Sequence, residues 1–457
     1  MSATWIEIEG LRGFAKPCRI SLAAPTGKAG SGLTILVGPN NSGKSTVIEA
    51  INAMVKRHES PSFAEGKRNI KTNRRIQISL GNERGAVRTL RTVESGGSET
   101  EWIEPGGESI VSDMFVLPSR RAFNPFFGKY EQNRDAYIQN YGLPSIRGML
   151  IDHFSARIFH MLKNREEFSK VLARVLKPLP DWTVELSDSN QYYLKFCDED
   201  QEHSSDGLGE GLISLFFIID ALYDSKVGSV IVIDEPELSL HPSLQKRLAA
   251  LLVDYAKDRQ IIIATHSPYF IDWKSIRAGA KIVRIVKEPD GIAAHELKAV
   301  DKIEGLLNNI NNPHILGLDA REVFFLEDGV ILVEGQEDVI CYGEIARQLN
   351  VAIHGEFYGW GVGGAGNMKT IAGILKELGF KKVAGILDNN MEEQCESLSK
   401  EFLDYRFFTI PTDDVRSKSP ILARDAVHGL LDDNHTLRQE YHADMRTLFE
   451  NVNSVTM

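Results

Sequence analysis

The sequence predicts an α/β protein in which a P-loop domain is followed by a Rossmann-like domain. Three observations predict this. A glycine-rich loop at residues 38–45 joins an apolar strand to a helix. Apolar strands and helices then alternate from Gly207 to about Ile285, and a second alternation begins at Val330. At 457 residues the chain is too long for one ordinary domain, so the two segments are expected to fold separately.

The domain boundary is expected in a loop rich in Asn and Gly that separates the two alternating segments. We predict a first domain over residues 1–315 and a second over residues 316–457, accurate to about ten residues. Before residue 120, short apolar runs broken by Gly, Asn and Ser predict a β-rich lobe. Apolar residues at helical spacing then predict a helical insertion over about residues 125–180. One buried helix face is predicted to contain Ile151, Phe154, Ile158, Met161 and Leu162.

The composition is that of a soluble globular protein, with 42% hydrophobic and 25% charged residues. The most apolar stretch, residues 208–223, is interrupted by Glu210 and Asp220, so no membrane span is expected. The N-terminus has no basic region followed by an apolar run, so no secretory signal is expected. Four widely spaced cysteines form no metal-binding pattern and predict reduced thiols in the cytoplasm: Cys18, Cys197, Cys341 and Cys395.

The formal net charge of −11 argues against a surface coated in basic residues. It does not exclude nucleic acid, because binding needs only a local basic patch. Basic groups lie at residues 67–75 and at Arg120–Arg121. Each is compatible with a nucleic-acid contact and with a solvated face, and the sequence leaves both interpretations open.

The most specific pattern is the loop from Gly38 to Ser45, which matches G-x-x-x-x-G-K-[ST]. The apolar strand at residues 34–37 leads into it and a helix leaves it at Lys44. Glycine lets backbone N–H groups wrap the phosphates of ATP. Lys44 is expected to contact the β and γ phosphates, and the Ser45 hydroxyl to ligate Mg²⁺. The residues predicted to hold ATP here are Gly38, Asn40, Asn41, Ser42, Gly43, Lys44, Ser45 and Thr46.

Two further strand ends have polar residues that suit ATP hydrolysis. The buried-strand pattern at residues 230–233 ends in Asp234 and Glu235. Asp234 is predicted to help hold Mg²⁺, and Glu235 to orient or deprotonate the attacking water. The next strand, residues 261–264, is followed by His266, which is predicted to sense the γ-phosphate. A helix cap is the alternative role at both strand ends.

In this order, the three motifs resemble those of the ABC ATPases of the SMC, RecF and OLD type. The resemblance implies a signature loop before the second motif. Its best counterpart is residues 204–211, with Ser205 and Gly207 at the nucleotide, although the loop departs from the common LSGGQ form. The resemblance also implies subunits arranged head to tail, each completing the other's ATP site, and a two-fold dimer closes such an arrangement.

The second domain presents acidic residues at the ends of two strands. The strand at residues 330–333 ends in Glu334, and the strand at residues 383–387 ends in Asp388. Carboxyl ends of the strands of such a sheet form its usual ligand site, so the two carboxylates could meet there. Hard oxygen ligands suit Mg²⁺ or Mn²⁺. Taken alone, acidic residues at strand ends are more often solvated or helix caps.

The segments VEGQED (residues 333–338) and GILDNN (residues 385–390) are similar to the Toprim domain that OLD-family proteins fuse to an ABC ATPase. The resemblance implies that acidic residues of this domain bind metal. Its metal ligands would be Glu334, Asp338, Asp388, Asn390 and Asp414.

One member of this set departs from the family pattern. The second aspartate of the family's D-x-D motif is Asn390 here, an amide that can ligate a hard cation but brings no charge. Glu334 and Asp388 are expected to be catalytic as well as metal-binding. Lys418 is the candidate for the basic residue with which such nucleases stabilise transition-state charge, and an exposed loop lysine is the alternative.

The resemblance implies an ATP-regulated, divalent-metal-dependent DNA endonuclease of the OLD type in anti-phage defence. ATP is expected to bias a homodimer or larger homo-oligomer between states and so to control cleavage. The alternative is an ATP-switched sensor or scaffold with a Toprim domain that does not cut. A primase or topoisomerase is disfavoured, because the chain lacks zinc-binding Cys/His spacing and the length for a further domain. Relatives work alone, with a helicase or beside a reverse transcriptase, and the sequence does not choose among these partners.

Overall fold

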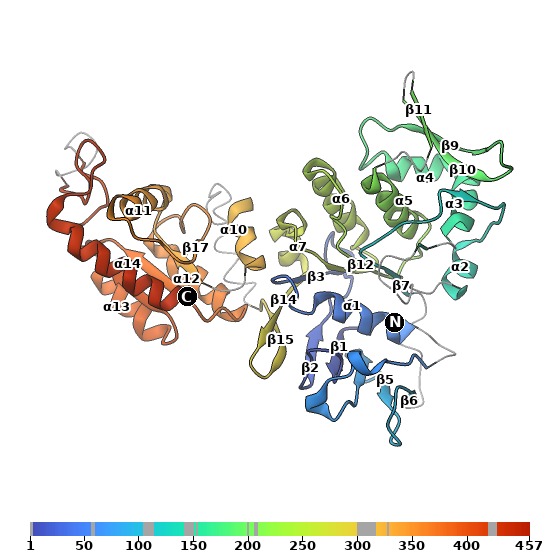
Figure 1. Cartoon of the computed structure of the whole chain (residues 1–457), viewed down its shortest axis with the longest axis horizontal. Helices are drawn as coiled ribbons and strands as arrows, with labels where there is room; N and C mark the ends of the chain where they lie inside the picture. Colours follow the sequence, from blue (N-terminus) through green and yellow to red (C-terminus); the bar gives the residue numbers. More distant parts are fainter. Residues whose placement is uncertain are drawn as a thin grey trace. The chain divides into compact units, whose positions relative to one another are not determined.

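The computed structural model describes residues 3–55, 60–103, 114–140, 150–151, 154–198, 201–204, 209–298, 317–326, 329–418 and 427–457. The chain forms two compact units, residues 1–296 and residues 297–457, each with its own sheets (Figure 1). The domain boundary predicted at residues 315–316 lies outside the described residues.

The first unit is built around a six-stranded sheet in the order β15-β14-β3-β13-β12-β7. Five strands run parallel, and β15 pairs antiparallel with β14 at one edge. Every residue of β3, β12 and β13 is buried, which explains why these strands are continuous apolar runs. The strands are β3 (Leu33–Val37), β7 (Met114–Leu117), β12 (Val230–Asp234), β13 (Gln260–Ala264), β14 (Lys281–Glu288) and β15 (Gly291–Glu296).

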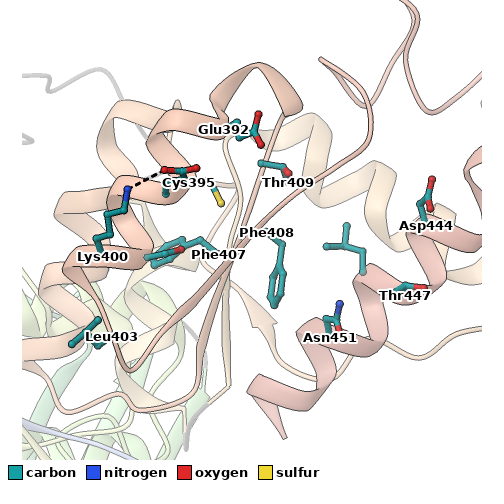
Figure 2. A pocket seen from close by; sticks show the side chains of 13 residues that line it. Glu392, Cys395, Lys400, Leu403, Phe407, Phe408, Thr409, Asp444, Thr447 and Asn451 are labelled. Carbon is teal, nitrogen blue, oxygen red and sulfur yellow. Dashed lines mark hydrogen bonds and ion pairs between the residues drawn. The ribbon is translucent and has the colours of Figure 1, made fainter.

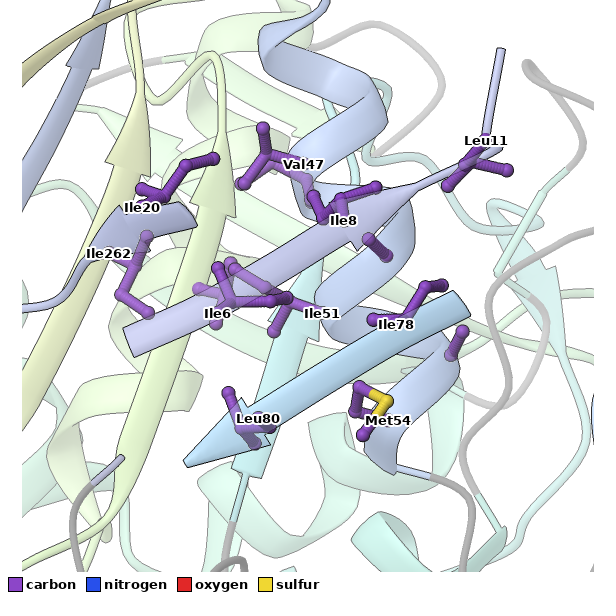
Figure 3. Packing of buried hydrophobic residues seen from close by; sticks show 14 of the residues in the cluster. Ile6, Ile8, Leu11, Ile20, Val47, Ile51, Met54, Ile78, Leu80 and Ile262 are labelled. Atoms are coloured by element: carbon purple, nitrogen blue, oxygen red, sulfur yellow. The ribbon is translucent and has the colours of Figure 1, made fainter. Parts of the chain in front are cut away.

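A five-stranded antiparallel sheet in the order β2-β1-β4-β5-β6 forms the β-rich lobe expected before residue 120. The helix α1 (Lys44–Val55) packs against strands of both sheets, and their apolar side chains form one core (Figure 3). Ile6 of the lobe, Ile51 of α1 and Ile262 of β13 all belong to it. Burial of α1 between two sheets fixes the loop that precedes it. The lobe comprises β1 (Trp5–Glu9), β2 (Cys18–Ser21), β4 (Gln77–Gly81), β5 (Val87–Thr92), β6 (Thr100–Ile103) and the 3₁₀ turns η1 (Glu65–Lys67) and η2 (Ile70–Thr72).

Three helices lie in the region of the expected helical insertion: α2 (Arg134–Asn140), α3 (Ser155–Lys163) and α4 (Arg165–Leu172). A small antiparallel sheet accompanies them, in which β10 pairs with the other three strands. Of the predicted buried face, four residues are buried and Leu162 is half-buried. The strands are β8 (Phe126–Phe127), β9 (Asp181–Leu186), β10 (Tyr192–Asp198) and β11 (Gln201–Ser204).

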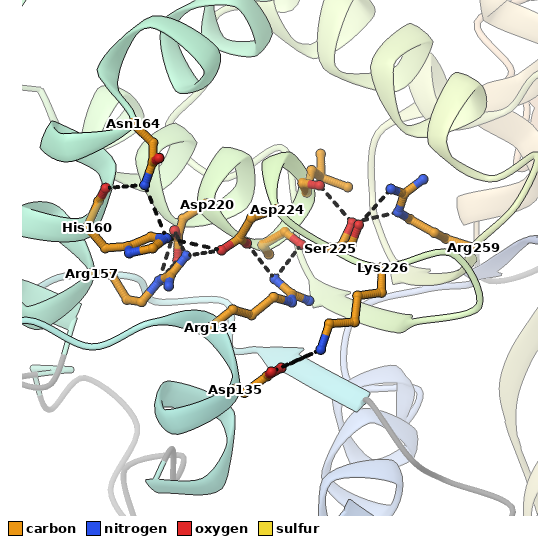
Figure 4. A network of polar contacts seen from close by, with 12 residues as sticks. Arg134, Asp135, Arg157, His160, Asn164, Asp220, Asp224, Ser225, Lys226 and Arg259 are labelled. Carbon is orange, nitrogen blue, oxygen red and sulfur yellow. Dashed lines mark hydrogen bonds and ion pairs between the residues drawn. The ribbon is translucent and has the colours of Figure 1, made fainter.

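The helix α5 (Glu210–Tyr223) packs on β7 and β12 and is almost wholly buried. Its Asp220 accepts hydrogen bonds of 2.7–3.1 Å from Nε and Nη2 of Arg157 in α3 (Figure 4). A second carboxylate, Asp224, accepts from both Arg157 and Arg134. The acid that interrupts the apolar run therefore anchors the insertion on α5. None of the described helices is long and apolar enough to cross a membrane.

The remaining helices of the first unit follow the strands of the six-stranded sheet. After β12 comes α6 (Pro242–Tyr255), which starts with proline at its first turn and with the His241 side chain accepting a hydrogen bond from Ser243 N–H. After β13 come the 3₁₀ turn η4 (Pro268–Phe270) and α7 (Trp273–Ala278). Each connection carries the chain back to the side of the sheet where the previous strand began, so the strands run in the same direction. The carboxyl ends of β3, β12 and β13 therefore lie together.

The second unit contains a four-stranded parallel sheet in the order β17-β16-β18-β19, the Rossmann-like arrangement that the sequence predicted. Ile331 and Ala384 of the sheet share one core with Tyr342 of α11 and Phe449 of α14. The strands are β16 (Val330–Leu332), β17 (Glu356–Phe357), β18 (Val383–Leu387) and β19 (Arg406–Thr409). The helices are α10 (Leu318–Glu322), α11 (Gln336–Leu349), α12 (Ala365–Glu377), α13 (Glu392–Glu401) and α14 (His442–Thr456), with 3₁₀ turns η5 (Val323–Phe325), η6 (Asn389–Met391) and η7 (Gln439–Tyr441).

The strand β19 lies at one edge of this sheet, with α13 and α14 on either side of it (Figure 2). Among the strands that the structure describes, β18 alone pairs with it. An open cavity of about 710 Å³ runs along the edge. Phe407 and Phe408 of the strand line it together with three carboxylates, those of Glu392, Glu396 and Asp444.

Candidate functional sites

Two glycines of the loop after β3 have backbone conformations that other residues rarely adopt. Gly38 has a φ of +134° and Gly43 a φ of +111°. A Cβ on Gly38 would lie 2.2 Å from the carbonyl oxygen of Ile285. A Cβ on Gly43 would lie 2.5 Å from Cδ1 of Ile292. The loop is thus held against β14 and β15, and only glycine fits at either position.

Lys44 is buried inside this loop. Its Nζ donates hydrogen bonds to the carbonyl oxygens of Gly38 (2.9 Å) and Pro39 (2.8 Å). Burial lowers the pKa of Lys44 to about 8, although the charges of Asp234 and Glu235 oppose this shift. A polyphosphate would supply the negative charge that a buried ammonium lacks. The other predicted loop residues differ in exposure: Asn40 and Asn41 are exposed, Ser45 is half-buried, and Ser42 and Thr46 are buried.

The strand β12 delivers Asp234 to the first turn of α1. The Ser45 hydroxyl donates a hydrogen bond of 3.3 Å to Oδ1 of Asp234, which is buried. The structure therefore brings together the two oxygen donors predicted to hold Mg²⁺ beside ATP, and both are of the hard type that Mg²⁺ prefers. Glu235 follows with a left-handed backbone of φ +49°, which turns the chain away from the sheet.

Arg121 is buried beneath this site, so the nucleic-acid and solvated-face interpretations of this residue are both wrong. Its Nη1 donates to the carbonyl oxygen of Asp234 and its Nη2 to that of Glu235, both at 2.8 Å. Its Nε donates to Oγ of Ser214 in α5. Arg121 thus holds the end of β12 in place. Sequence reasoning missed this role, because an arginine that binds backbone carbonyls has no pattern of its own.

Glu237 joins the ends of β12 and β13. Its Oε1 accepts a hydrogen bond of 2.6 Å from the backbone N–H of His266, and its Oε2 one of 2.8 Å from the Thr265 hydroxyl. Burial raises the pKa of Glu237. Burial and the charge of Lys44 lower the pKa of His266, so its ring is neutral near pH 7. Sequence reasoning missed Glu237, although it is the third acid of the segment Asp234–Glu237.

The predicted signature residues Ser205 and Gly207 lie outside the described residues. The apolar helix expected after them is α5. Its start contacts the turn after β12, since a Cβ on Gly211 would lie 2.2 Å from the carbonyl oxygen of Ser239. The Ser239 hydroxyl also donates a hydrogen bond of 3.1 Å to Glu210. The start of α5 and the turn that follows Glu235 are therefore in direct contact.

In the second unit, Glu334 and Asp388 meet at the carboxyl edge of the parallel sheet. They follow β16 and β18, which pair directly. Oε1 of Glu334 accepts a hydrogen bond of 3.1 Å from the backbone N–H of Asp388, and both residues are half-buried. Burial and the negative charge of Glu334 raise the pKa of Asp388 to about 8. A carboxyl group in this environment favours a nearby cation or a proton.

Asp338 lies in the first turn of α11. Its Oδ2 accepts a hydrogen bond of 2.8 Å from the N–H of Gly335, so it caps the helix. Burial raises the pKa of Asp338 to about 6, and the charges of Glu334 and Asp414 act in the same direction. The structure therefore gives Asp338 a helix-cap role, and the same carboxylate also lies near other acids.

The loop after β19 brings Asp414 and Lys418 to this edge. Lys418 forms an ion pair with Asp414. The charges of both reach Asp388, where Asp414 favours the protonated form and Lys418 the ionised form. Asn390 is exposed, and its side-chain amide donates a hydrogen bond of 3.4 Å to the carbonyl oxygen of Asp413. Lys418 is thus a component of the carboxylate cluster and not an isolated surface lysine.

The side chains of this cluster fit a divalent cation in chemical type. Carboxylate oxygens are hard ligands, and neighbouring buried carboxylates repel until a cation neutralises them. Within the described part of the chain, no group of three or more His, Cys, Asp or Glu side chains is close enough to hold a metal ion. Binding would therefore require Glu334, Asp388 and Asp414 to rotate toward one another, with Asp414 leaving Lys418.

Family models match both units. Residues 1–91 match a family described as an AAA ATPase domain, and residues 61–272 match one described as "AAA domain, putative AbiEii toxin, Type IV TA system". Residues 325–389 match the family described as Overcoming lysogenization defect protein-like, TOPRIM domain. The fold and these matches define the class: an enzyme that joins a P-loop ATPase domain to a Toprim nuclease domain.

Two curated relatives, at 24% identity each, agree with this class. The chain is 24% identical over 419 residues to the OLD nuclease of Thermus scotoductus, and the alignment covers 76% of each protein. It is 24% identical over 280 residues to the Septu protein PtuA of Bacillus thuringiensis, which covers 54% of this chain and 68% of that protein. A solved Smc head domain from Pyrococcus furiosus covers 68% of this chain and 100% of its own at 14% identity, with a TM-score of 0.43. Together with the Toprim match, these similarities support an ATPase–Toprim protein of the OLD type.

Proposed function

We propose that the protein is an ATP-regulated, divalent-metal-dependent DNA endonuclease. The observation that carries this proposal is the meeting of Glu334 and Asp388, which follow neighbouring strands and are joined by a hydrogen bond. A cluster of acids at the carboxyl edge of a parallel sheet is suited to hold cations beside a phosphodiester. The similarity to an OLD nuclease over 76% of the chain supports the same activity.

The first unit would bind and hydrolyse ATP. Lys44 would bind the β and γ phosphates, and Ser45 and Asp234 would hold Mg²⁺. Glu235 would accept a proton from the attacking water, while neutral His266 would form a hydrogen bond with the γ-phosphate. A second copy arranged head to tail would supply its own Ser205 and Gly207 to the nucleotide, so ATP would favour a homodimer or higher homo-oligomer.

The second unit would cut DNA. Glu334, Asp388 and Asp414 would hold Mg²⁺ or Mn²⁺, and Asp338 and Asn390 would contribute further oxygen atoms. The metal supplies Lewis-acid activation of water and of the phosphodiester when it is bound. Lys418 would stabilise the negative charge that develops on the phosphate once its pairing with Asp414 is released.

We also propose a cytoplasmic role in anti-phage defence, as the resemblance to the OLD family implies. The similarity to the Septu protein PtuA, which covers 54% of this chain, supports this proposal. A helicase or a reverse transcriptase is the candidate partner protein. Genetic tests in an infected host would check the defence role and the partner protein.

A second candidate function is an ATP-switched sensor or scaffold that does not cut DNA. Two observations favour it. Asn390 stands where the family's motif has a second aspartate, and Asp414 is paired with Lys418. The two functions differ in whether any combination of metal and nucleotide produces cleavage.

The test is cleavage of a supercoiled plasmid in Mg²⁺ or Mn²⁺, with ATP, ADP, a non-hydrolysable ATP analogue or no nucleotide. We expect the wild type to cut in at least one nucleotide state, and EDTA to stop it. Glu334→Ala and Asp388→Ala should each lower the rate at least about 100-fold, because each removes an anionic donor from the cluster. Lys44→Ala should abolish ATP turnover by removing the cation that binds the phosphates.

Asp404→Asn is the matched control for the nuclease site. Asp404 is an exposed acid of the same unit and comes just before β19. It therefore lies at the amino ends of the strands, opposite the carboxyl ends where the cluster lies. Its replacement should leave cleavage unchanged. A wild type that cuts under no condition supports the scaffold function instead. Equal cleavage by wild type and both alanine variants would show that the nuclease site lies elsewhere.

A further inference from the structure

One edge of β19 presents backbone groups that pair with no other strand among those the structure describes. On the other edge lies β18, where the N–H of Ile410 donates a hydrogen bond of 3.0 Å to the carbonyl oxygen of Leu387. Backbone direction alternates along a strand, so Phe407 and Thr409 direct their N–H and C=O groups away from β18. The four residues of β19 extend over about 13 Å. An edge of this kind can accept a further strand.

The open cavity beside this edge provides space for such a strand. Its lining comes from β19 and from the two helices that flank it, α13 and α14 (Figure 2). The side chains of β19 alternate between these helices. Phe407 contacts Phe402 at the end of α13, whereas Phe408 packs against the core that contains Leu448 of α14. Side chains of an added strand would alternate in the same way, one towards α13 and the next towards α14.

Exposed acids line the cavity on both helices. Glu392 and Glu396 belong to α13, and Asp444 belongs to α14. Lys400 also lines the cavity, and its Nζ forms an ion pair of 2.9 Å with Glu396. Within the described residues, Glu392 and Asp444 form no ion pair. Both walls of the cavity therefore attract positive charge, and they disfavour an acidic segment or an identical copy of the same surface.

We propose that the edge of β19 binds an extended segment of a partner protein that has lysine or arginine at successive positions. The segment adds to the sheet as a further strand, and its backbone pairs with that of Phe407 and Thr409. One basic side chain reaches Glu392 and the next reaches Asp444. This surface goes beyond the proposed nuclease function, and binding to it requires neither metal nor nucleotide.

The test uses a capped, fluorescently labelled peptide of about eight residues that contains threonine, valine and pairs of adjacent lysines. One comparison peptide has glutamate in place of lysine, and another keeps lysine but is methylated at every internal backbone nitrogen. Fluorescence anisotropy measures their binding to the full chain without metal or nucleotide. We expect the lysine peptide to bind at least about 10-fold more tightly than the glutamate peptide, because attraction becomes repulsion. Methylation should weaken binding at least about 5-fold, the effect of losing about two backbone hydrogen bonds.

Variants of the chain locate the binding, and circular dichroism verifies that each is folded. Glu392→Lys and Asp444→Lys should each weaken binding of the lysine peptide about 3- to 30-fold, since each replaces an exposed attractive pair by a repulsive one. Thr409→Pro removes an outward N–H without removing a bond to β18, and should weaken binding at least about 3-fold. Glu393→Lys and Glu450→Lys are the matched controls, because they reverse exposed acids of α13 and α14 that do not line the cavity. Both should bind as the wild type does.

Four results would overturn the proposal. The first is a wild type that does not bind the lysine peptide, or binds the glutamate peptide equally well. The second is equal binding of the methylated peptide, which would mean that charge alone attracts it. Equal losses in Glu392→Lys and Glu393→Lys would place the binding outside the cavity. A smaller oligomer in Thr409→Pro, measured by sedimentation velocity, would assign the edge to a second copy of this chain.

Discussion

Adjacent acids at the end of β12 occupy different environments. Asp234 is buried and accepts a hydrogen bond from Ser45, whereas Glu235 is half-buried and its left-handed backbone turns it out of the strand. The environment of Asp234 suits a side chain that binds a metal ion and stays in one position. That of Glu235 suits a group that exchanges protons with a water molecule, because such a group must reach solvent.

From this difference we predict the behaviour of Glu235→Gln. The amide keeps the size of the side chain but cannot accept a proton, so ATP hydrolysis should fall by about 100- to 10,000-fold. ATP binding should change little, because Lys44 and the loop remain. Phosphate release measures the first quantity and titration calorimetry the second. Glu83→Gln, in an exposed position of the antiparallel lobe, is the control. Hydrolysis at the normal rate in Glu235→Gln would assign the base to another residue.

At the scale of elements, the ion pair between α3 and α5 is a fully buried polar contact that attaches the insertion to the rest of the unit. Arg157 is 0% exposed and Asp220 is 2% exposed, so neither charge is solvated by water. Removing one partner leaves the other charged and buried, which costs more than the pair itself contributes. The attachment of the insertion therefore depends on both residues being present.

Arg157→Met should lower the free energy of unfolding of the first unit by about 3–5 kcal/mol. The double variant Arg157→Met/Asp220→Leu should recover most of this loss, since neither charge of the pair remains and Asp224 keeps its hydrogen bond with Arg134. Lys170→Met breaks the exposed pairs with Glu166 and Glu167 and should leave the free energy of unfolding nearly unchanged, because water solvates these charges. Urea denaturation followed by circular dichroism measures all three. A double variant as unstable as the single one would contradict the explanation.

At the scale of the whole molecule, each unit has its own hydrophobic core. The core of the first unit surrounds α1, and that of the second lies between the parallel sheet, α11 and α14. Calorimetry should therefore show two unfolding transitions. ATP analogue at about 100 times its Kd should stabilise only the first unit, by about 2.7 kcal/mol. Lys44→Ala should lose this stabilisation. A single transition whose midpoint temperature rises when nucleotide is added would mean that the two units unfold together.

The ends of several strands could be predicted from the sequence, because at each of them an apolar run is followed directly by a polar residue. This signal located Asp234, His266, Glu334 and Asp388, and the structure brings the last two together. This signal depends only on the local pattern of residues. A buried parallel strand must be apolar on both faces, and ligands bind at the carboxyl ends of such strands.

Other residues could not be assigned, because their roles are set by neighbours distant in sequence. Arg121 binds the carbonyl oxygens of residues more than 110 positions away, and Glu237 binds a backbone N–H at the end of a different strand. Asp338 both caps a helix and lies near other acids, whereas the sequence indicated only a metal ligand at this position. The order of the sheet, with β13 between β3 and β12, likewise depends on tertiary packing.

One edge of β19 is paired with no other strand that the structure describes, and this has a consequence for how the protein behaves in concentrated solution. The Ile410 N–H bonds to β18, so by alternation the backbone groups of Phe407 and Thr409 face outward. Outward-facing backbone of this kind can pair with another molecule. The flanking acids, Glu392, Glu396 and Asp444, would repel an identical surface. Colloidal stability should therefore be greatest in dilute buffer and should decline as added electrolyte shortens the range of this repulsion, which light scattering across a sodium chloride series would reveal.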